Sequence, residues 1–107
     1  MIIKTNTLDK LERLTTLYRL GYHSKFIDQV LDKIILLEQQ RAQQELAKFQ
    51  TRLQAFEKKY HMSSQQFYQQ YEHGELDDSA DFMEWSSFYD LNMSTQQHLE
   101  WLIGGHN

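Results

Sequence analysis

Carboxylates and aromatic rings alternate in one segment of the sequence, FYQQYEHGELDDSADFMEWSSFYD, between Phe67 and Asp90. Aromatic side chains are common anchors of protein interfaces, and carboxylates steer a basic surface toward them. The segment therefore predicts a docking surface for a basic protein. The candidate partner-binding residues, acting as contacts or as supports, are five rings and five acids: Phe67, Tyr71, Trp85, Phe88, Tyr89, Glu75, Asp77, Asp78, Asp81 and Glu84.

The same residues also have a local explanation. Asp77, Asp78 and Asp81 lie where a helix is expected to begin, and carboxylates there cap N–H groups and interact favourably with the helix dipole. The rings can equally form a hydrophobic core. Capping does not explain why no lysine or arginine follows Lys59, because Glu–Lys pairs four residues apart commonly support helix surfaces. Both interpretations stay open.

Charge is distributed unevenly along the chain. Residues 1–59 contain all 11 lysines and arginines beside seven acids, a formal charge of +4, whereas residues 60–107 contain eight acids, a charge of −8. Such asymmetry indicates an interaction more readily than a reaction. Nucleic acid is disfavoured as the partner of the acidic end, because phosphates would meet carboxylates there.

Patterns typical of catalysis or metal binding are weak. The five histidines lack metal-ligand spacing, and the pair Asp81 and Glu84, three residues apart, has no accompanying motif. No glycine-rich phosphate loop or nucleophile elbow occurs. The chain has no cysteine, which excludes disulfides and thiolate metal sites. We expect a protein that is not an enzyme and binds no cofactor or metal.

Composition predicts an all-α fold. The chain has no proline and four glycines, which favours long uninterrupted helices. Apolar residues at helical spacing predict a first helix with Asn6 or Thr7 as its N-cap. Gly21 is suited to end that helix in a left-handed conformation.

A long second helix is predicted over residues 24–60, about 55 Å at 1.5 Å per residue. Its first part is apolar on most sides and must pack against the first helix and against a second copy or a partner. Apolar residues at 42–60 form a heptad seam. The seam either forms a homodimeric coiled coil or packs against the C-terminal helices, and its bulky rings favour the second alternative. The predicted dimerisation residues are Leu11, Leu14, Tyr18, Phe26, Ile27, Val30, Ile34 and Leu37.

Two or three shorter helices are predicted after this central helix. Ser63 and Gln66 form a capping box for a helix over 64–73, which ends at Gly74. The next helix either continues past Ser94 or restarts there. Its candidate N-caps are Asp77, Asp78 and Ser79.

These elements predict one elongated helical domain over residues 1–107. It comprises an N-terminal hairpin with the long helix (1–60) and the acidic aromatic helices (61–107). No apolar run reaches the roughly 18–20 residues that span a bilayer, and the start lacks the features of a signal peptide. We therefore expect a cytoplasmic protein without a membrane partner.

The segment from Met62 to Asp90 resembles a signature of small all-helical proteins of bacteria and archaea, M-S-S-x-x-F-x-x-x-[FY]-x-x-G-E-L-x-D-[DS]-x-D-F-x-E-W-[SA]-x-[FY]-x-[DE]. The segment LTTLYRLGYHSKFIDQVLDKIILLE is similar to the front half of the same proteins. The resemblance therefore extends from about Leu14 to Asp90. The matching residues are Met62, Ser63, Ser64, Phe67, Tyr71, Gly74, Glu75, Leu76, Asp78, Asp81, Phe82, Glu84, Trp85, Ser86, Phe88 and Asp90.

Proteins of that family are typically encoded beside a small partner and are treated as antitoxin-like components of toxin–antitoxin pairs. The resemblance implies a small basic toxin as the partner, often one that acts on RNA, held by the acidic aromatic region. It brings no catalytic residues.

Three functions are therefore predicted in order of preference. The first is an antitoxin-like protein that binds and neutralises a small basic toxin. The alternative is a homodimeric structural or adaptor protein without a toxin. A DNA-binding autoregulator is less favoured, because its second helix is apolar where polar residues should contact bases.

Overall fold

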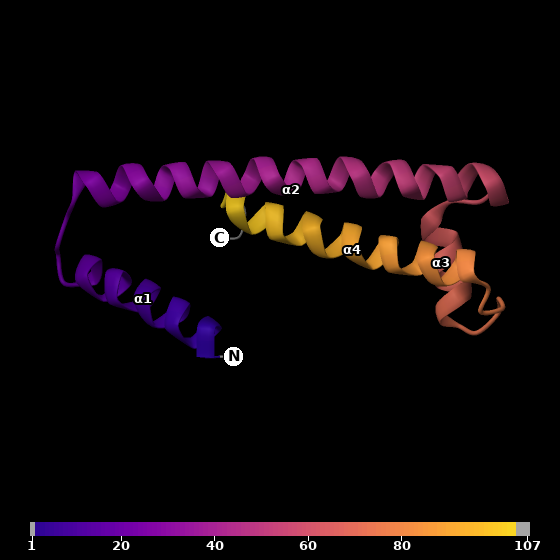
Figure 1. The fold of residues 1–107 in the computed structure, drawn as a ribbon, viewed down its shortest axis with the longest axis horizontal. Helices are drawn as coiled ribbons and strands as arrows, with labels where there is room; N and C mark the ends of the chain where they lie inside the picture. Colours follow the sequence, from indigo (N-terminus) through magenta and orange to yellow (C-terminus); the bar gives the residue numbers. More distant parts are fainter. Residues whose placement is uncertain (1, 105–107) are drawn as a thin grey trace. The chain divides into compact units, whose positions relative to one another are not determined.

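The computed structural model describes the backbone of residues 2–104 and the side chains of residues 6–104, and this part is helical without strands (Figure 1). The predicted all-α class with a long central helix is confirmed. No described helix combines the length and the apolar character of a membrane span. The helices are α1 (Ile2–Arg19), α2 (Lys25–Tyr60), α3 (Ser64–Glu72) and α4 (Ala80–Ile103).

The sequence predicted the C-terminal end of α1 correctly and its N-terminal end wrongly. α1 begins at Ile2, so the prediction that Asn6 or Thr7 is its N-cap is wrong. Residues 2–7 contain no proline or glycine, the residues that would disfavour a helix there. The predicted end at Gly21 is confirmed, with φ at 99°. Gly21 N–H donates to Tyr18 O (3.1 Å) and Tyr22 N–H donates to Leu17 O (3.0 Å). These two bonds form a Schellman motif, whose left-handed residue is best a glycine.

Local capping also fixes the ends of α3 and α4. Ser63 Oγ accepts from Gln66 N–H (3.1 Å), as the capping box predicted. Ser79 is the N-cap of α4, since its Oγ accepts from Phe82 N–H (3.2 Å). α4 then continues past Ser94, so two C-terminal helices follow α2.

The chain forms two compact units, and the boundary between them lies within α2. The first unit extends to Lys33 and contains α1 and the start of α2. The second unit begins at Ile34 and contains the rest of α2 with α3 and α4. The single domain predicted for residues 1–107 stays a prediction.

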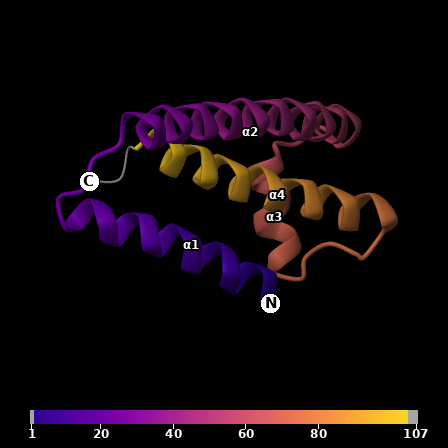
Figure 2. The same cartoon turned by 60° about the vertical axis from the view of Figure 1, so that its left-hand side comes forward.

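In the second unit α4 runs antiparallel to α2 (Figures 1 and 2). Gln39 Nε2 donates to Leu102 O (2.9 Å) near one end of this pair. Lys59 and Tyr60 bind Asp81 at the other end. α3 lies beside the N-terminal part of α4, where the two helix backbones approach closely.

The buried core of the second unit lies where these three helices meet. Its members are Leu53, Phe56, Phe67 and Trp85. Phe56 belongs to the predicted heptad seam of residues 42–60, and it stacks on Trp85 of α4. The seam thus packs against α4, which was the favoured alternative to a homodimeric coiled coil.

The first unit has no such core. None of residues 6–33 is buried, and its most covered apolar side chains are only half-buried. These are Leu14, Tyr18, Ile27 and Leu31. Two helices that bury so little have weak stability of their own.

We expect Trp85→Ala to lower the free energy of unfolding by about 3–5 kcal/mol, because it removes a fully buried indole and leaves a cavity. Chemical denaturation followed by circular dichroism measures this change. Trp101→Ala is the matched control, because Trp101 is 66% exposed and its truncation should cost less than about 1 kcal/mol. Equal losses in the two variants would contradict the role of Trp85 in the core.

Candidate functional site

Two of the five candidate rings are completely buried. Phe67 and Trp85 are 0% exposed and stack with their centroids 3.9 Å apart. Phe56 and Tyr60 of α2 also stack on Trp85, at 5.5 and 5.7 Å. Trp85 Nε1 donates to Ser64 Oγ (2.9 Å), which satisfies the buried N–H. Of the two predicted roles, contact or support, only support fits these two rings, because a fully buried ring offers no surface to a partner.

The three other candidate rings keep part of their surface accessible. Tyr71, Phe88 and Tyr89 are half-buried. Tyr71 stacks on Phe67 (5.4 Å) and Tyr89 lies against Tyr68 (4.5 Å). All three rings therefore pack against the core and keep part of their surface accessible.

Asp81 is bound tightly within the fold. Lys59 Nζ donates to its Oδ2 (2.7 Å), and Tyr60 OH donates to the same oxygen. The hydrogen bond from Lys59, followed by that from Tyr60, holds the pKa of Asp81 below its ordinary value. The bond to Asp81 in turn raises the pKa of Lys59 and of Tyr60. Asp81 thus joins α4 to the end of α2, and its charge is already compensated.

Asp77 and Asp78 order the connection between α3 and α4. Asp77 Oδ1 accepts from Ser79 N–H (3.2 Å), and Tyr71 OH donates to Asp78 Oδ1 (3.3 Å). Burial, followed by the nearby Asp78 charge, raises the pKa of Tyr71. Both carboxylates remain exposed while holding defined positions.

Glu75 and Glu84 are the other two exposed acids among the five candidate acids. Glu75 Oε2 lies 3.7 Å from His73 Nδ1, with both side chains more than half exposed. Glu84 lies in the second turn of α4 and is also exposed. We call the four exposed acids the acidic corner: Glu75, Asp77, Asp78 and Glu84.

No lysine or arginine follows Lys59 in the sequence, and basic side chains of α2 instead contact α4. Lys59 pairs with Asp81, and the guanidinium of Arg52 lies over the Phe88 ring, 5.6 Å from its centroid. Lys59 thus compensates the charge of Asp81, and Arg52 adds a cation–π contact on the side of α4 that faces α2. They do not involve the acidic corner.

Sequence reasoning missed Tyr68 as a residue that holds this surface together. Its OH donates to Asp90 Oδ1 (2.6 Å), which is the main reason that the pKa of Tyr68 lies well above its ordinary value. Tyr60 and Tyr71 bind Asp81 and Asp78 in the same way. The available signal was the abundance of tyrosine beside carboxylates.

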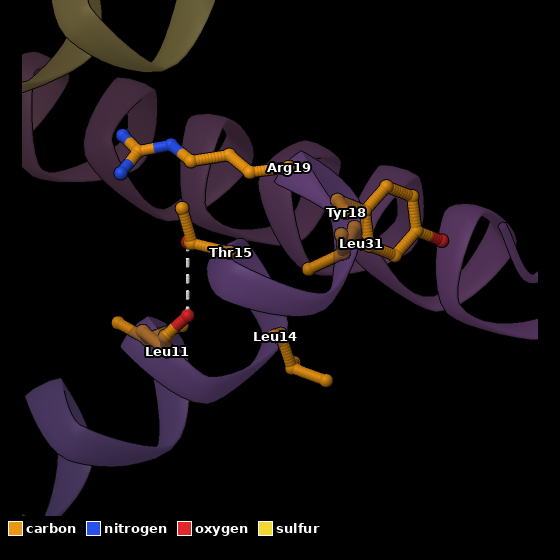
Figure 3. A pocket seen from close by; sticks show the side chains of 6 residues that line it. All are labelled: Leu11, Leu14, Thr15, Tyr18, Arg19 and Leu31. Carbon is orange, nitrogen blue, oxygen red and sulfur yellow. Dashed lines mark hydrogen bonds between the residues drawn. The ribbon is translucent and has the colours of Figure 1, made fainter. Parts of the chain in front are cut away.

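The predicted dimerisation residues lie on α1 and the first half of α2. Three of them, Leu14, Tyr18 and Ile27, are half-buried. Within the first unit, Leu11, Leu14, Thr15, Tyr18, Arg19 and Leu31 line an open hollow of about 400 Å³ (Figure 3). The five others are 39–74% exposed: Leu11, Phe26, Val30, Ile34 and Leu37.

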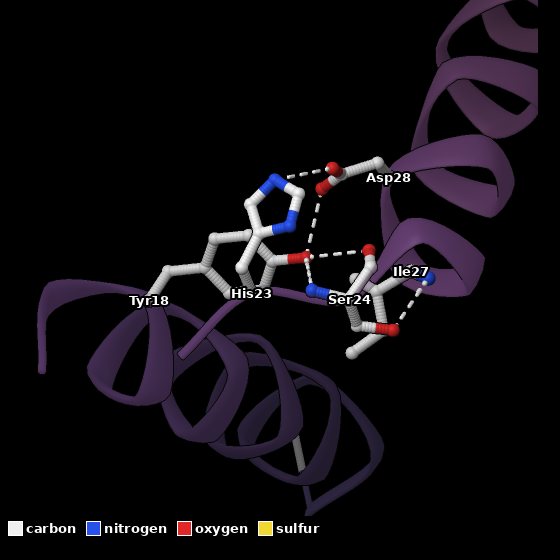
Figure 4. A network of polar contacts seen from close by, with 5 residues as sticks. All are labelled: Tyr18, His23, Ser24, Ile27 and Asp28. Atoms are coloured by element: carbon white, nitrogen blue, oxygen red, sulfur yellow. Dashed lines mark hydrogen bonds and ion pairs between the residues drawn. The ribbon is translucent and has the colours of Figure 1, made fainter. Parts of the chain in front are cut away.

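A polar network closes the turn between α1 and α2 (Figure 4). Tyr18 OH donates to Asp28 Oδ1 (2.8 Å) and accepts from Ser24 N–H (3.3 Å). His23 Nε2 lies 3.1 Å from Asp28 Oδ2, and Ile27 N–H donates to Ser24 Oγ (3.2 Å). Burial, followed by the bond to Asp28, raises the pKa of Tyr18. The network sets the direction in which α2 leaves the turn.

Among the described residues, no group of three or more histidine and carboxylate side chains is arranged to hold a metal ion. The chain matches no protein-family model, no curated protein and no solved structure. The resemblance to antitoxin-like proteins and the predicted binding surfaces therefore stay predictions.

The Asp81 site predicts an acid-sensitive contribution to stability. Folding lowers the pKa of Asp81 below its value in the unfolded chain, which is about 3.9. The stabilisation is therefore fully present at a pH above about 3.9, and it is lost as the pH falls through the lower pKa of the folded state. We expect Lys59→Gln to raise the Asp81 pKa toward 3.9, measured by NMR titration of the carboxyl group. Lys58→Gln is the control, since it removes a neighbouring charge without this hydrogen bond. An unchanged Asp81 pKa in Lys59→Gln would contradict the assignment.

Proposed function

We propose that this protein is a non-catalytic binding protein of the antitoxin type. It neutralises a small basic partner protein through the acidic aromatic end of its second unit. The acidic corner is the observation that carries this proposal, because four exposed carboxylates lie within residues 75–84. Residues 34–107, the second unit, have eleven acids and five basic residues, a formal charge of −6. Residues 1–33, the first unit, have four acids and six basic residues, a formal charge of +2.

A rigid support behind the acidic corner favours binding. The stack of Phe67 and Trp85 fixes α3 and α4, and hydrogen bonds from Tyr71 and from the Ser79 backbone order Asp78 and Asp77. A charged surface that is ordered before binding loses less conformational entropy when the complex forms.

The surface also offers apolar contacts beside its charges. Met83 is 55% exposed next to Glu84, and the half-buried Tyr71 adds part of a ring. Carboxylates would steer the partner, and these side chains would then exclude water from the contact.

Neutralisation follows from competition for one basic surface. A toxin that acts on RNA must hold phosphates with lysine and arginine side chains. The same side chains attract carboxylates, so a bound acidic corner covers the surface that the RNA needs. A cytoplasmic location is part of this proposal.

The apolar surface of α1 and the start of α2 favours a second candidate, a homodimeric structural or adaptor protein without a toxin. Co-expression with the product of the adjacent gene, followed by purification, separates the two candidates. We expect a stable complex with a small basic protein. Recovery of this chain alone would contradict the antitoxin proposal and favour the adaptor.

We expect the double variant Glu75→Gln and Glu84→Gln to slow association with the co-purified partner by about tenfold at low salt, because steering depends on charge. The salt dependence of the rate should also flatten, as measured by stopped-flow mixing over a range of ionic strengths. The control Glu12→Gln with Asp32→Asn removes two exposed acids of the first unit and should leave the rate unchanged. An unchanged rate in the Glu75 and Glu84 variant would contradict steering by the acidic corner.

A further inference from the structure

The contact between α2 and α4 changes in character along its length. The buried core of the second unit lies at the α3 end of this pair. Phe49 and Phe88 join the two helices about one turn farther along, with ring centroids 6.1 Å apart. Beyond them, within residues 34–48 of α2 and 89–103 of α4, the buried side chains are Ala42, Asn92 and Thr95. One methyl group and two polar side chains thus take the place of the rings.

Asn92 makes the closed contact unfavourable at one point. It is only 8% exposed, its Oδ1 is enclosed, and no described residue donates a hydrogen bond to that oxygen. Asn92 lies three residues before Thr95 and seven after Trp85, and residues at these spacings share one face of a helix. A buried acceptor without a partner loses the hydrogen bonds that water would give it. Separation of the two helices at Asn92 would therefore remove a penalty.

Packing beside Asn92 is also incomplete. An open hollow of about 310 Å³ lies between the two helices, and its lining includes Arg41, Ala42 and Glu45 of α2 and Thr95, His98 and Leu102 of α4. Side chains that border a hollow lack the dispersion contacts that a filled core provides. Arg41 lies within 4 Å of two acids of its own helix, at 3.9 Å from Glu38 and 3.8 Å from Glu45. These ion pairs join parts of α2 to each other and leave α4 without a charged partner in the hollow.

A single hydrogen bond closes the far end of the pair. Gln39 Nε2 donates to Leu102 O (2.9 Å), a carbonyl in the last turn of α4. The last four carbonyls of a helix have no partner within the helix, so Gln39 supplies one from α2. Both groups can bond to water when the helices separate, so the net contribution of this bond to closure is small.

We infer that residues 92–103 of α4 form an arm that separates from α2 and returns to it, while residues 80–89 stay packed in the core. Asn92 favours the separated state, and the bond between Gln39 and Leu102 favours the closed state. The arm does not include the acidic corner, so its test does not depend on the proposed function.

Thiol reactivity measures the separation, because a buried thiol reacts with an alkylating reagent when the structure around it opens. The chain has no cysteine, so Thr95→Cys and Ser86→Cys each introduce a single thiol. The two positions are matched, since they lie on one helix and are 8% and 9% exposed. Thr95 belongs to the arm, whereas Ser86 follows Trp85 of the core.

Each rate is divided by the rate of the same thiol in the unfolded chain. The thiol at position 95 should then react about tenfold faster than the thiol at position 86, because it needs only a local opening. Equal normalised rates would mean that both thiols react through global unfolding, and would overturn the inference.

Two further changes in the Thr95→Cys chain test what controls the arm. Asn92→Leu removes the unpaired amide and should slow the reaction at position 95 by about tenfold, since the closed state no longer carries its penalty. Gln39→Ala removes the closing bond and should speed the reaction several-fold. Gln40→Ala is the control, because Gln40 is exposed, and it should leave the rate unchanged. A rate that Asn92→Leu does not slow would overturn the role of Asn92.

Discussion

The stack of Phe67 on Trp85 is the contact on which the second unit depends. It joins α3 to α4, and Phe56 and Tyr60 extend it to α2, so one group of rings joins three helices. Aromatic side chains suit this purpose because each buries a large area with few rotatable bonds. The Trp85 N–H finds its partner in Ser64 at the start of α3, so the indole is buried without an unsatisfied donor.

Hydrogen bonds between tyrosine and aspartate surround this core. Tyr60, Tyr68 and Tyr71 each donate to a carboxylate, to Asp81, Asp90 and Asp78. Each phenol packs its ring against the core and places its OH at the surface. Asp78, Asp81 and Asp90 thus help to hold the fold together.

The two units differ in how they achieve stability. The second has a core of its own and an acidic surface, which suits reversible binding of a basic protein. The first has no buried side chain among residues 6–33, so it has little stability of its own.

Local chemistry in the sequence determined the helices and most of their ends. Ser63, Ser79 and Gly21 act through bonds to residues three positions away, which is why their roles were predictable. Only the tertiary structure decided which rings are buried and which acids are compensated. Those outcomes depend on pairs about twenty residues apart, such as Lys59 with Asp81, and the order of residues alone does not specify such pairs.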